Sequence, residues 1–221
     1  MKKQLLLSIL TIYSTFVIAQ NSPSIGIRGG LAVAGLRGDA VSKMENLIDF
    51  TNGMVHTGNR TGFFAGGYAS LPISENISVE PALYYTQKGY AIRGSFALKA
   101  IDILGANAKA QLNAHYIDLP ILLKANINGL QVFAGPQVSY LTAANLQTTA
   151  GVLGINLLNK KLDATAQFNR WDAGITGGVG YQFSNGVNLT AAYDHGLTRM
   201  DANKSLNSYN RSFKIGVGFR L

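Results

Sequence analysis

The segment Phe213-Lys-Ile-Gly-Val-Gly-Phe-Arg-Leu221 is the most informative part of this sequence for the fold class. Alternate side chains of a β-strand point to opposite faces, so one face of this segment receives only apolar residues. The other face receives Lys214, Arg220 and glycines. A soluble sheet would bury so uniform an apolar face, whereas a membrane barrel presents it to lipid. The segment therefore predicts a strand of a transmembrane β-barrel.

The composition agrees with this prediction. Charged residues make up 14% of the chain, whereas soluble domains have about 25%. Glycine occurs 25 times, and tyrosine and phenylalanine 10 times each. This balance is typical of a barrel whose outer face meets lipid and whose interior is crowded. The absence of cysteine excludes thiol chemistry and cysteine-based metal sites.

The first 20 residues have the pattern of a secretory signal. Lys2 and Lys3 precede an apolar run at 5–18, and Ala19-Gln20 offers a cleavage site. The alternative, a retained anchor, is disfavoured because a spanning helix needs about 20 apolar residues. We therefore expect a signal peptide at 1–20 and one barrel domain at 21–221, exported to the bacterial outer membrane.

The formal net charge is +8. The basic residues form no cluster interleaved with aromatic residues, so nucleic acid is not an expected partner. Contact with anionic lipid headgroups and ion pairing inside the barrel explain the excess better. The expected partners are outer-membrane lipid, the barrel-assembly machinery, and other envelope or secretion proteins.

Short and long connections alternate along the chain, as in an antiparallel up-and-down barrel with tight periplasmic turns. Tight turns are expected at 74–76, 128–129 and 184–186. The expected strands lie near 25–36, 61–73, 77–90, 113–127, 130–143, 166–183, 187–196 and 209–221. Eight strands is the preferred count. Apolar residues at 96–104 and 152–162 leave strand extensions, small helices or an extra hairpin open, with ten strands as the alternative.

Side-chain alternation places the charges of the strand interiors inside the barrel. A charge facing lipid would cost about 2–4 kcal/mol at the midplane. The expected inward charges are Glu80, Lys88, Asp118, Lys124, Arg170, Asp172, Asp194 and Lys214. We expect Lys88 to pair with Asp118, Glu80 with Lys124, and the remaining four to gather near the outer end. A salt-bridged plug is the preferred interpretation, and a narrow polar pore is the alternative.

Two arginines and several aromatic residues complete the expected barrel wall. Arg28 and Arg220 should lie near the periplasmic mouth without an identified acidic neighbour. Glu80, water or a terminal carboxylate would serve them, or else they form a weak anion or partner site. An outer aromatic girdle is expected from Tyr85, Tyr140, Trp171, Tyr193 and Phe213.

Several strings resemble the PorT-like family of outer-membrane β-barrel proteins, within the porin-like families. They are Pro72-Ile-Ser-Glu-Asn-Ile-Ser-Val-Glu-Pro-Ala-Leu-Tyr-Tyr-Thr-Gln-Lys-Gly89, Tyr116-Ile-Asp-Leu-Pro-Ile-Leu-Leu-Lys124 and Phe133-Ala-Gly-Pro-Gln-Val-Ser-Tyr-Leu141. In the second string Asp118 stands where the family has glutamate. The resemblance implies an outer-membrane barrel without an active site. Because the family's namesake is associated with type IX secretion, it also implies an accessory role in protein export.

The sequence offers no catalytic constellation, cofactor motif or metal site. His56 falls in a long connection, and His115 and His195 have outward positions. The inward carboxylates Asp172 and Asp194 have basic neighbours, which favours ion pairing over catalysis. We therefore expect a non-enzymatic structural or accessory barrel. A small passive porin and a membrane-embedded hydrolase or acyltransferase remain as alternatives.

Overall fold

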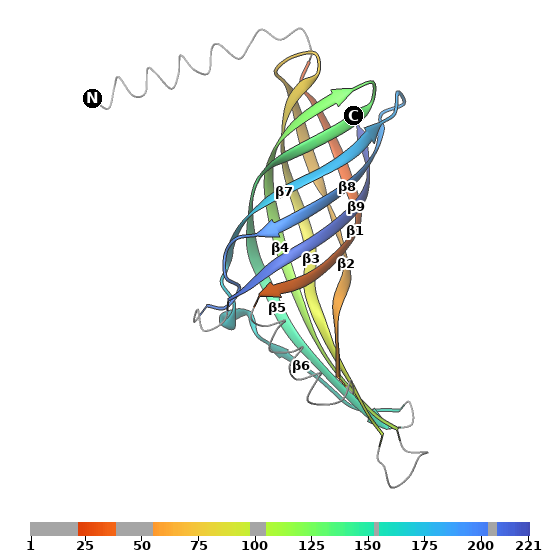
Figure 1. Ribbon diagram of the computed structural model, residues 1–221, viewed down its shortest axis with the longest axis vertical. Coiled ribbons are helices and arrows are strands. Elements are labelled where there is room, and N and C mark those ends of the chain that lie inside the picture. The colour runs from red at the N-terminus through yellow and green to blue at the C-terminus, as the bar shows by residue number, and fades with distance from the viewer. Residues whose placement is uncertain (1–21, 39–54, 98–104, 153–154, 203–206) are drawn as a thin grey trace, which may run out of the picture.

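A computed structural model describes residues 22–38, 55–97, 105–152, 155–202 and 207–221 (Figure 1). The strands in these ranges are β1 Ser24–Gly38, β2 Val55–Pro72, β3 Ile77–Ala97, β4 Gly105–Ile127, β5 Leu130–Val152, β6 Ile155–Asp163, β7 Trp171–Gln182, β8 Val187–Gly196 and β9 Ser208–Arg220. A short 3-10 helix, η2 Thr165–Gln167, precedes β7. None of the described residues belongs to a helix long and apolar enough to cross a membrane. The expected signal peptide lies outside the described residues.

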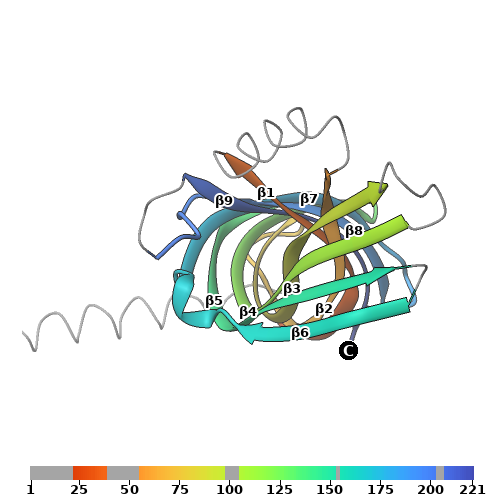
Figure 2. The ribbon, with the colours of Figure 1, turned by 90° about the horizontal axis from the view of Figure 1, so that it is seen from below.

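Eight of the strands form a closed antiparallel ring. The order is β1-β2-β3-β4-β5-β7-β8-β9, and β9 pairs with β1 from Gly26↔Arg220 to Gly38↔Ser208 (Figures 1 and 2). The predicted eight-stranded barrel is therefore confirmed. β6 stays outside the ring and pairs with β5 alone. It occupies the apolar segment whose structure the sequence left open, and the described residues contain no tenth strand.

The tight turns have the backbone that their residues favour. Asn128 and Gly129, between β4 and β5, have φ angles of 53° and 89°. Two consecutive positive φ angles define the hairpin turn whose twist matches its strands, and Asn-Gly is its preferred sequence. The Asn126 side chain accepts a hydrogen bond from the Gly129 amide at 3.0 Å. These contacts fix the register of the β4–β5 pair.

The predicted side-chain alternation holds in the barrel wall. In β9, Ser212 and Lys214 are buried while Phe213, Ile215 and Val217 are exposed. The same alternation runs through β3, β4, β7 and β8. Because every backbone group in a closed ring has a neighbouring strand, such a wall can lie in hydrocarbon without unpaired edges. The exposed apolar residues form its lipid-facing surface.

Three strands of the wall, β3, β4 and β5, continue well past the expected boundaries on one side. β3 and β4 remain paired to Ala97↔Gly105, and β4 and β5 to Ala106↔Val152. With β6 they form a sheet beyond the barrel, here called the outer sheet: residues 89–97, 105–114, 144–152 and 155–163 (Figure 1). The strand expected at 166–183 instead begins at Trp171, because η2 and an irregular segment precede it.

The polarity of the wall reverses where the outer sheet begins. On the barrel side of this point the outward residues are apolar or aromatic, as at Leu119 and Ile121. In the outer sheet the outward row carries amide side chains: Gln111, Asn113, Asn145, Gln147 and Asn159. The inward row of the outer sheet carries Leu112, Leu146, Leu158 and Leu162. Because amides on the outward face would be costly in hydrocarbon, the reversal marks the outer boundary of the membrane.

The closing register generates a direct test. In a Leu31→Cys/Ile215→Cys variant the two positions are direct partners across the β1–β9 seam. Their Cα atoms should be about 5.5 Å apart, within the reach of a disulfide. The native chain has no cysteine to interfere. Mild oxidation should therefore give a boiled protein that migrates faster in a denaturing gel until it is reduced.

The matched control for that test moves one cysteine by two residues. Leu31→Cys/Val217→Cys keeps the same face but makes the pair diagonal, about 7–8 Å apart. It should crosslink far less. Equal crosslinking of both variants, or none of either, would contradict the seam register.

Candidate functional site

The barrel lumen holds a balanced set of buried charges. Among the described residues, the buried basic side chains are Arg28, Lys88, Lys124 and Lys214, and the buried acidic ones are Glu80, Asp118, Asp172 and Asp194. They come from six of the eight ring strands. An eight-stranded barrel has an interior just wide enough for side chains to fill. Each charge must therefore find its partner among other lumenal side chains and not in bulk water.

One cluster centres on Glu80. Arg28 Nη1 lies 2.8 Å from Glu80 Oε1, and Lys124 Nζ pairs with Oε2 of the same carboxylate. Arg28 also donates to Tyr84 Oη at 2.9 Å and to Asn188 Oδ1 at 3.2 Å. Of the partners considered for Arg28, namely Glu80, water or a terminal carboxylate, the structure has Glu80. Glu80 thus links β1, β3 and β4 through two cations.

A second cluster centres on Asp118. Lys88 Nζ lies 2.9 Å from Asp118 Oδ1, and Lys214 Nζ lies 3.0 Å from Oδ2. Lys214 also lies 2.7 Å from Asp194 Oδ2. The expected Lys88–Asp118 neighbours are thus together, with Lys214 as an additional partner. Asp118 is completely buried, so these cations are what makes its charge tolerable.

Asp172 is bound differently from the other carboxylates. Its Oδ2 accepts a hydrogen bond from Asn210 Nδ2 at 2.7 Å, and its buried Oδ1 has no hydrogen-bond partner among the described residues. The expected partner Arg170 is absent from the lumen, and that prediction is wrong. Arg170 precedes β7, is exposed, and donates to the Leu141 carbonyl at 3.5 Å. The alternation rule failed because the chain is no longer a strand at residue 170.

Arg220 also lies outside the charge clusters. It is exposed at the end of β9, opposite Gly26. Arg28 and Arg220 therefore do not form a joint site, because one is paired in the lumen and the other is at the surface.

Each buried cation also lies over an aromatic ring. The distances to the ring centroids are 4.3 Å for Arg28 over Tyr68, 4.6 Å for Lys88 over Tyr116, 5.5 Å for Lys124 over Phe133 and 5.6 Å for Lys214 over Phe64. Such contacts contribute about 0.5–2 kcal/mol each, more when desolvated. The sequence analysis missed these partners. These aromatic residues have inward positions in the side-chain alternation, and that pattern could have predicted that they lie beside the lumenal cations.

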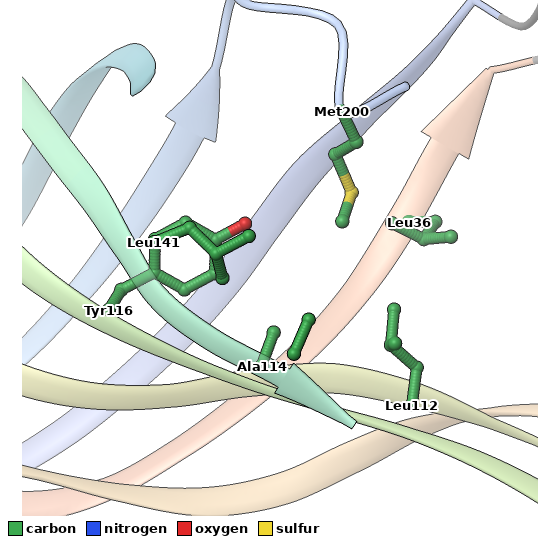
Figure 3. Packing of buried hydrophobic residues seen from close by; sticks show 7 residues of the cluster. Leu36, Leu112, Ala114, Tyr116, Leu141 and Met200 are labelled. Carbon is green, nitrogen blue, oxygen red and sulfur yellow. The ribbon is translucent and has the colours of Figure 1, made fainter. Parts of the chain in front are cut away.

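An apolar cluster closes the outer end of the lumen (Figure 3). Its members are Leu36, Leu112, Ala114, Tyr116, Leu141, Ala144 and Met200. Met200 comes from the β8–β9 connection and packs against side chains of β1, β4 and β5. Two cavities of about 10 and 30 Å³ lie among the lumenal side chains. A single water needs about 10–15 Å³, so each holds at most a few waters.

The site shows no arrangement for catalysis or metal binding in the described part of the chain. No group of three or more metal-ligating side chains is present there. His115 faces outward beside Tyr85, and His195 shares the outward face with Tyr193. His56 lies in β2, and its side chain is outside the described residues. In the described residues no hydrogen bond joins Asp172 or Asp194 to His115 or His195, although His195 borders the same small cavity.

The aromatic residues expected at the outer rim lie on the outward face. Trp171, Tyr193 and Phe213 are exposed, and Tyr85 and Tyr140 are half-buried. The rings of Tyr140 and Trp171 pack edge to face with centroids 4.8 Å apart.

Comparison with known proteins gives one family match and several structural matches. The model of the family described as outer membrane protein beta-barrel domain matches residues 18–202. No curated protein matches the sequence significantly. Similar solved structures are Neisserial surface protein A (14% identity, 91% of this chain and 100% of that one, TM-score 0.46), Ail of Yersinia pestis (13%, 91% and 100%, 0.40) and OprG from Pseudomonas aeruginosa (13%, 90% and 96%, 0.42).

The charge clusters predict a specific pattern of stability. Asp118→Ala strands Lys88 and removes one of two partners of Lys214, so it should lower the free energy of unfolding by about 3–5 kcal/mol. The double variant Lys88→Met/Asp118→Leu should cost much less, because Lys214 keeps Asp194. Urea unfolding in lipid or detergent measures both. Small, equal shifts of about 0–1 kcal/mol would instead indicate a wet, screened lumen.

Proposed function

Because the chain belongs to the outer membrane protein beta-barrel domain family, a family of the bacterial outer membrane, we propose that it is a non-enzymatic, non-conducting barrel that presents its outer sheet to other envelope proteins. In this role the barrel is a rigid, sealed anchor, and the outer sheet is the interacting part. The partner class we favour is the protein-secretion apparatus, in keeping with the PorT-like resemblance. The barrel-assembly machinery is a transient partner during insertion.

The filled lumen is the observation that supports a non-conducting barrel. Opening a water path would require separating Asp118 from Lys88 and Lys214, which are buried and 2.9–3.0 Å apart. It would also require displacing the apolar cluster at the outer end, in which Leu141 and Ala144 have no exposed surface. Both steps oppose ion flow, so the passive-porin alternative is the weaker one.

The outer sheet supports a role in protein contact. Within the described residues β6 pairs with one strand only, so its other edge has backbone groups open to a further strand. Leu146, Leu158 and Leu162 on its inward face are 37–49% exposed. Exposed apolar residues beside an unpaired strand edge are typical of interaction surfaces. The enzymatic alternatives have no comparable support, since the described lumenal carboxylates are paired or hydrogen-bonded and none of them is hydrogen-bonded to a described histidine.

The sealed lumen predicts that the purified protein does not conduct. In a planar lipid bilayer, insertion of the wild-type barrel should leave the current at the level of the empty membrane. An open porin reconstituted in parallel shows that the assay detects channels. Stable open channels from the wild-type protein would contradict the proposal of a sealed barrel and favour the passive porin.

The outer sheet predicts site-dependent crosslinking in native outer membranes. A photoreactive residue at Leu158 or Leu162 should give a discrete protein adduct. The same residue at Leu189, equally exposed but on the lipid-facing wall, should not. Mass spectrometry of the adduct identifies the partner. Identical adducts from all three sites, or none from the outer sheet, would contradict the proposed contact role.

A further inference from the structure

One of the two small cavities lies in the lumen near the outer ends of β7, β8 and β9. Its volume is about 10 Å³, which is the space of one water-sized particle. Its polar lining includes Gln137, Ser139, Asp172, Asp194 and Ser212. The cavity is therefore bordered mainly by side chains that carry oxygen atoms.

Two of these oxygen atoms are buried and have no hydrogen-bond partner among the described residues. They are Asp172 Oδ1 and Ser212 Oγ. Asp172 is 7% exposed and Ser212 is 2% exposed, so both depend on neighbours inside the lumen. A buried polar atom without a partner is destabilising, most of all when it carries charge. The cavity therefore suits an occupant that contacts a carboxylate oxygen and a hydroxyl oxygen together.

The charges in this part of the lumen do not balance. Two ammonium groups, Lys88 and Lys214, lie among three carboxylates, Asp118, Asp172 and Asp194. The ion pairs use both ammonium groups on Asp118 and Asp194. Asp172 has no ion pair within 4 Å in the described part of the chain. One buried negative charge at the cavity is therefore without a cation.

The positive surplus of the lumen lies elsewhere. At the Glu80 cluster, Arg28 and Lys124 share one carboxylate. Neither of these cations borders the cavity. The hydrogen bond that Asp172 accepts comes from the neutral amide of Asn210, at 2.7 Å. These residues leave room for a positive charge that the protein itself does not supply.

The other titratable groups at the cavity do not supply that charge either. Lys88 borders the cavity, but its ammonium group is paired with Asp118 at 2.9 Å. His195 and Arg211 also border it, from the outward rows of β8 and β9. No ion pair within 4 Å joins Asp172 to either of them in the described residues.

The ligand set favours a monovalent cation over a divalent one. Hard cations bind oxygen atoms, and Ca²⁺ takes about six to eight of them, including carboxylates. Here one carboxylate oxygen and one hydroxyl oxygen are unused, and Lys88 brings a positive charge to the same space. A single positive charge would balance Asp172, whereas a double charge would exceed it.

We propose that this cavity binds one monovalent metal cation of the size of Na⁺ between Asp172 and Ser212. Asp172 is the second residue of β7 and keeps 7% of its surface exposed, whereas Asp118 is completely buried. A cation can therefore enter from the outer end without separating the charge pairs that seal the lumen. Because the cation binds the folded barrel, it couples the stability of the barrel to the salt outside the cell.

The test is thermal unfolding of the purified barrel in neutral detergent over a series of NaCl concentrations, with choline chloride keeping the ionic strength constant. The midpoint of wild-type protein should rise by about 3–6 °C for each tenfold increase in Na⁺ above the dissociation constant. Asp172→Asn keeps the side-chain shape but removes the charge, so it should lose this dependence. Asp163→Asn, at an exposed carboxylate away from the cavity, is the matched control and should keep it.

A second variant and a direct measurement complete the experiment. Ser212→Ala retains the carboxylate but removes one ligand, so it should need about fivefold more Na⁺ for the same rise. Crystals soaked in Rb⁺ should show an anomalous peak between Asp172 and Ser212. Unchanged migration of unboiled protein verifies that each variant is folded.

Three results would overturn the proposal. Wild-type stability that ignores Na⁺, with no anomalous peak, would mean that the cavity holds water only. Stability that follows pH but not Na⁺ would mean that a proton neutralises Asp172. An equal dependence on Na⁺ in wild type, Asp172→Asn and Ser212→Ala would place the cation somewhere else.

Discussion

A charge inside a closed eight-stranded barrel has no access to bulk water, and its compensation comes from side chains on neighbouring strands or across the lumen. The pairing of Asp118 with Lys88 and Lys214, and of Glu80 with Arg28 and Lys124, follows from that constraint. The aromatic rings beneath each cation use the remaining space. The sealed interior is therefore a consequence of ring size as much as of the particular residues, because a narrow ring brings opposite walls within reach of one another.

The outer sheet meets water on its outward face, whereas the outward face of the barrel wall meets lipid. Once the strands pass the membrane boundary, amides on the outward face meet water, and leucines turn to the inward face. The two-residue alternation therefore places apolar side chains outward in the barrel wall but inward in the outer sheet.

Much of this architecture could be predicted from sequence. Alternation alone identified the lipid-facing wall, the inward charges and the Lys88–Asp118 neighbours, because the two-residue period is insensitive to strand length. The strand ends were harder. Residues 144–163 were placed in a connection, whose apolar part at 152–162 left strand extensions, small helices or an extra hairpin open. The structure has an extended β5 paired with β6 there, under the reversed polarity. Arg170 was misplaced for a related reason, since alternation has no meaning once the chain leaves the strand.

The partners around the charges could not be read from local sequence. Lys214 and Asp118 are 96 residues apart, and Arg28 and Asn188 are 160 apart. Only the register of the closed ring brings them together.

That separation has a consequence for how the barrel assembles. Lys214 is on the last strand and Arg28 on the first, and the seam between these strands is the final pairing that a chain made from its N-terminus can complete. Until Lys214 arrives, the fully buried carboxylate of Asp118 has Lys88 as its one cation and Asp194 has none within 4 Å among the described residues. The pairing of β9 with β8 brings Lys214 to Asp194, and closure of the ring brings the same ammonium group against Asp118 on β4. Completing the barrel therefore also completes the ion pairing of its interior.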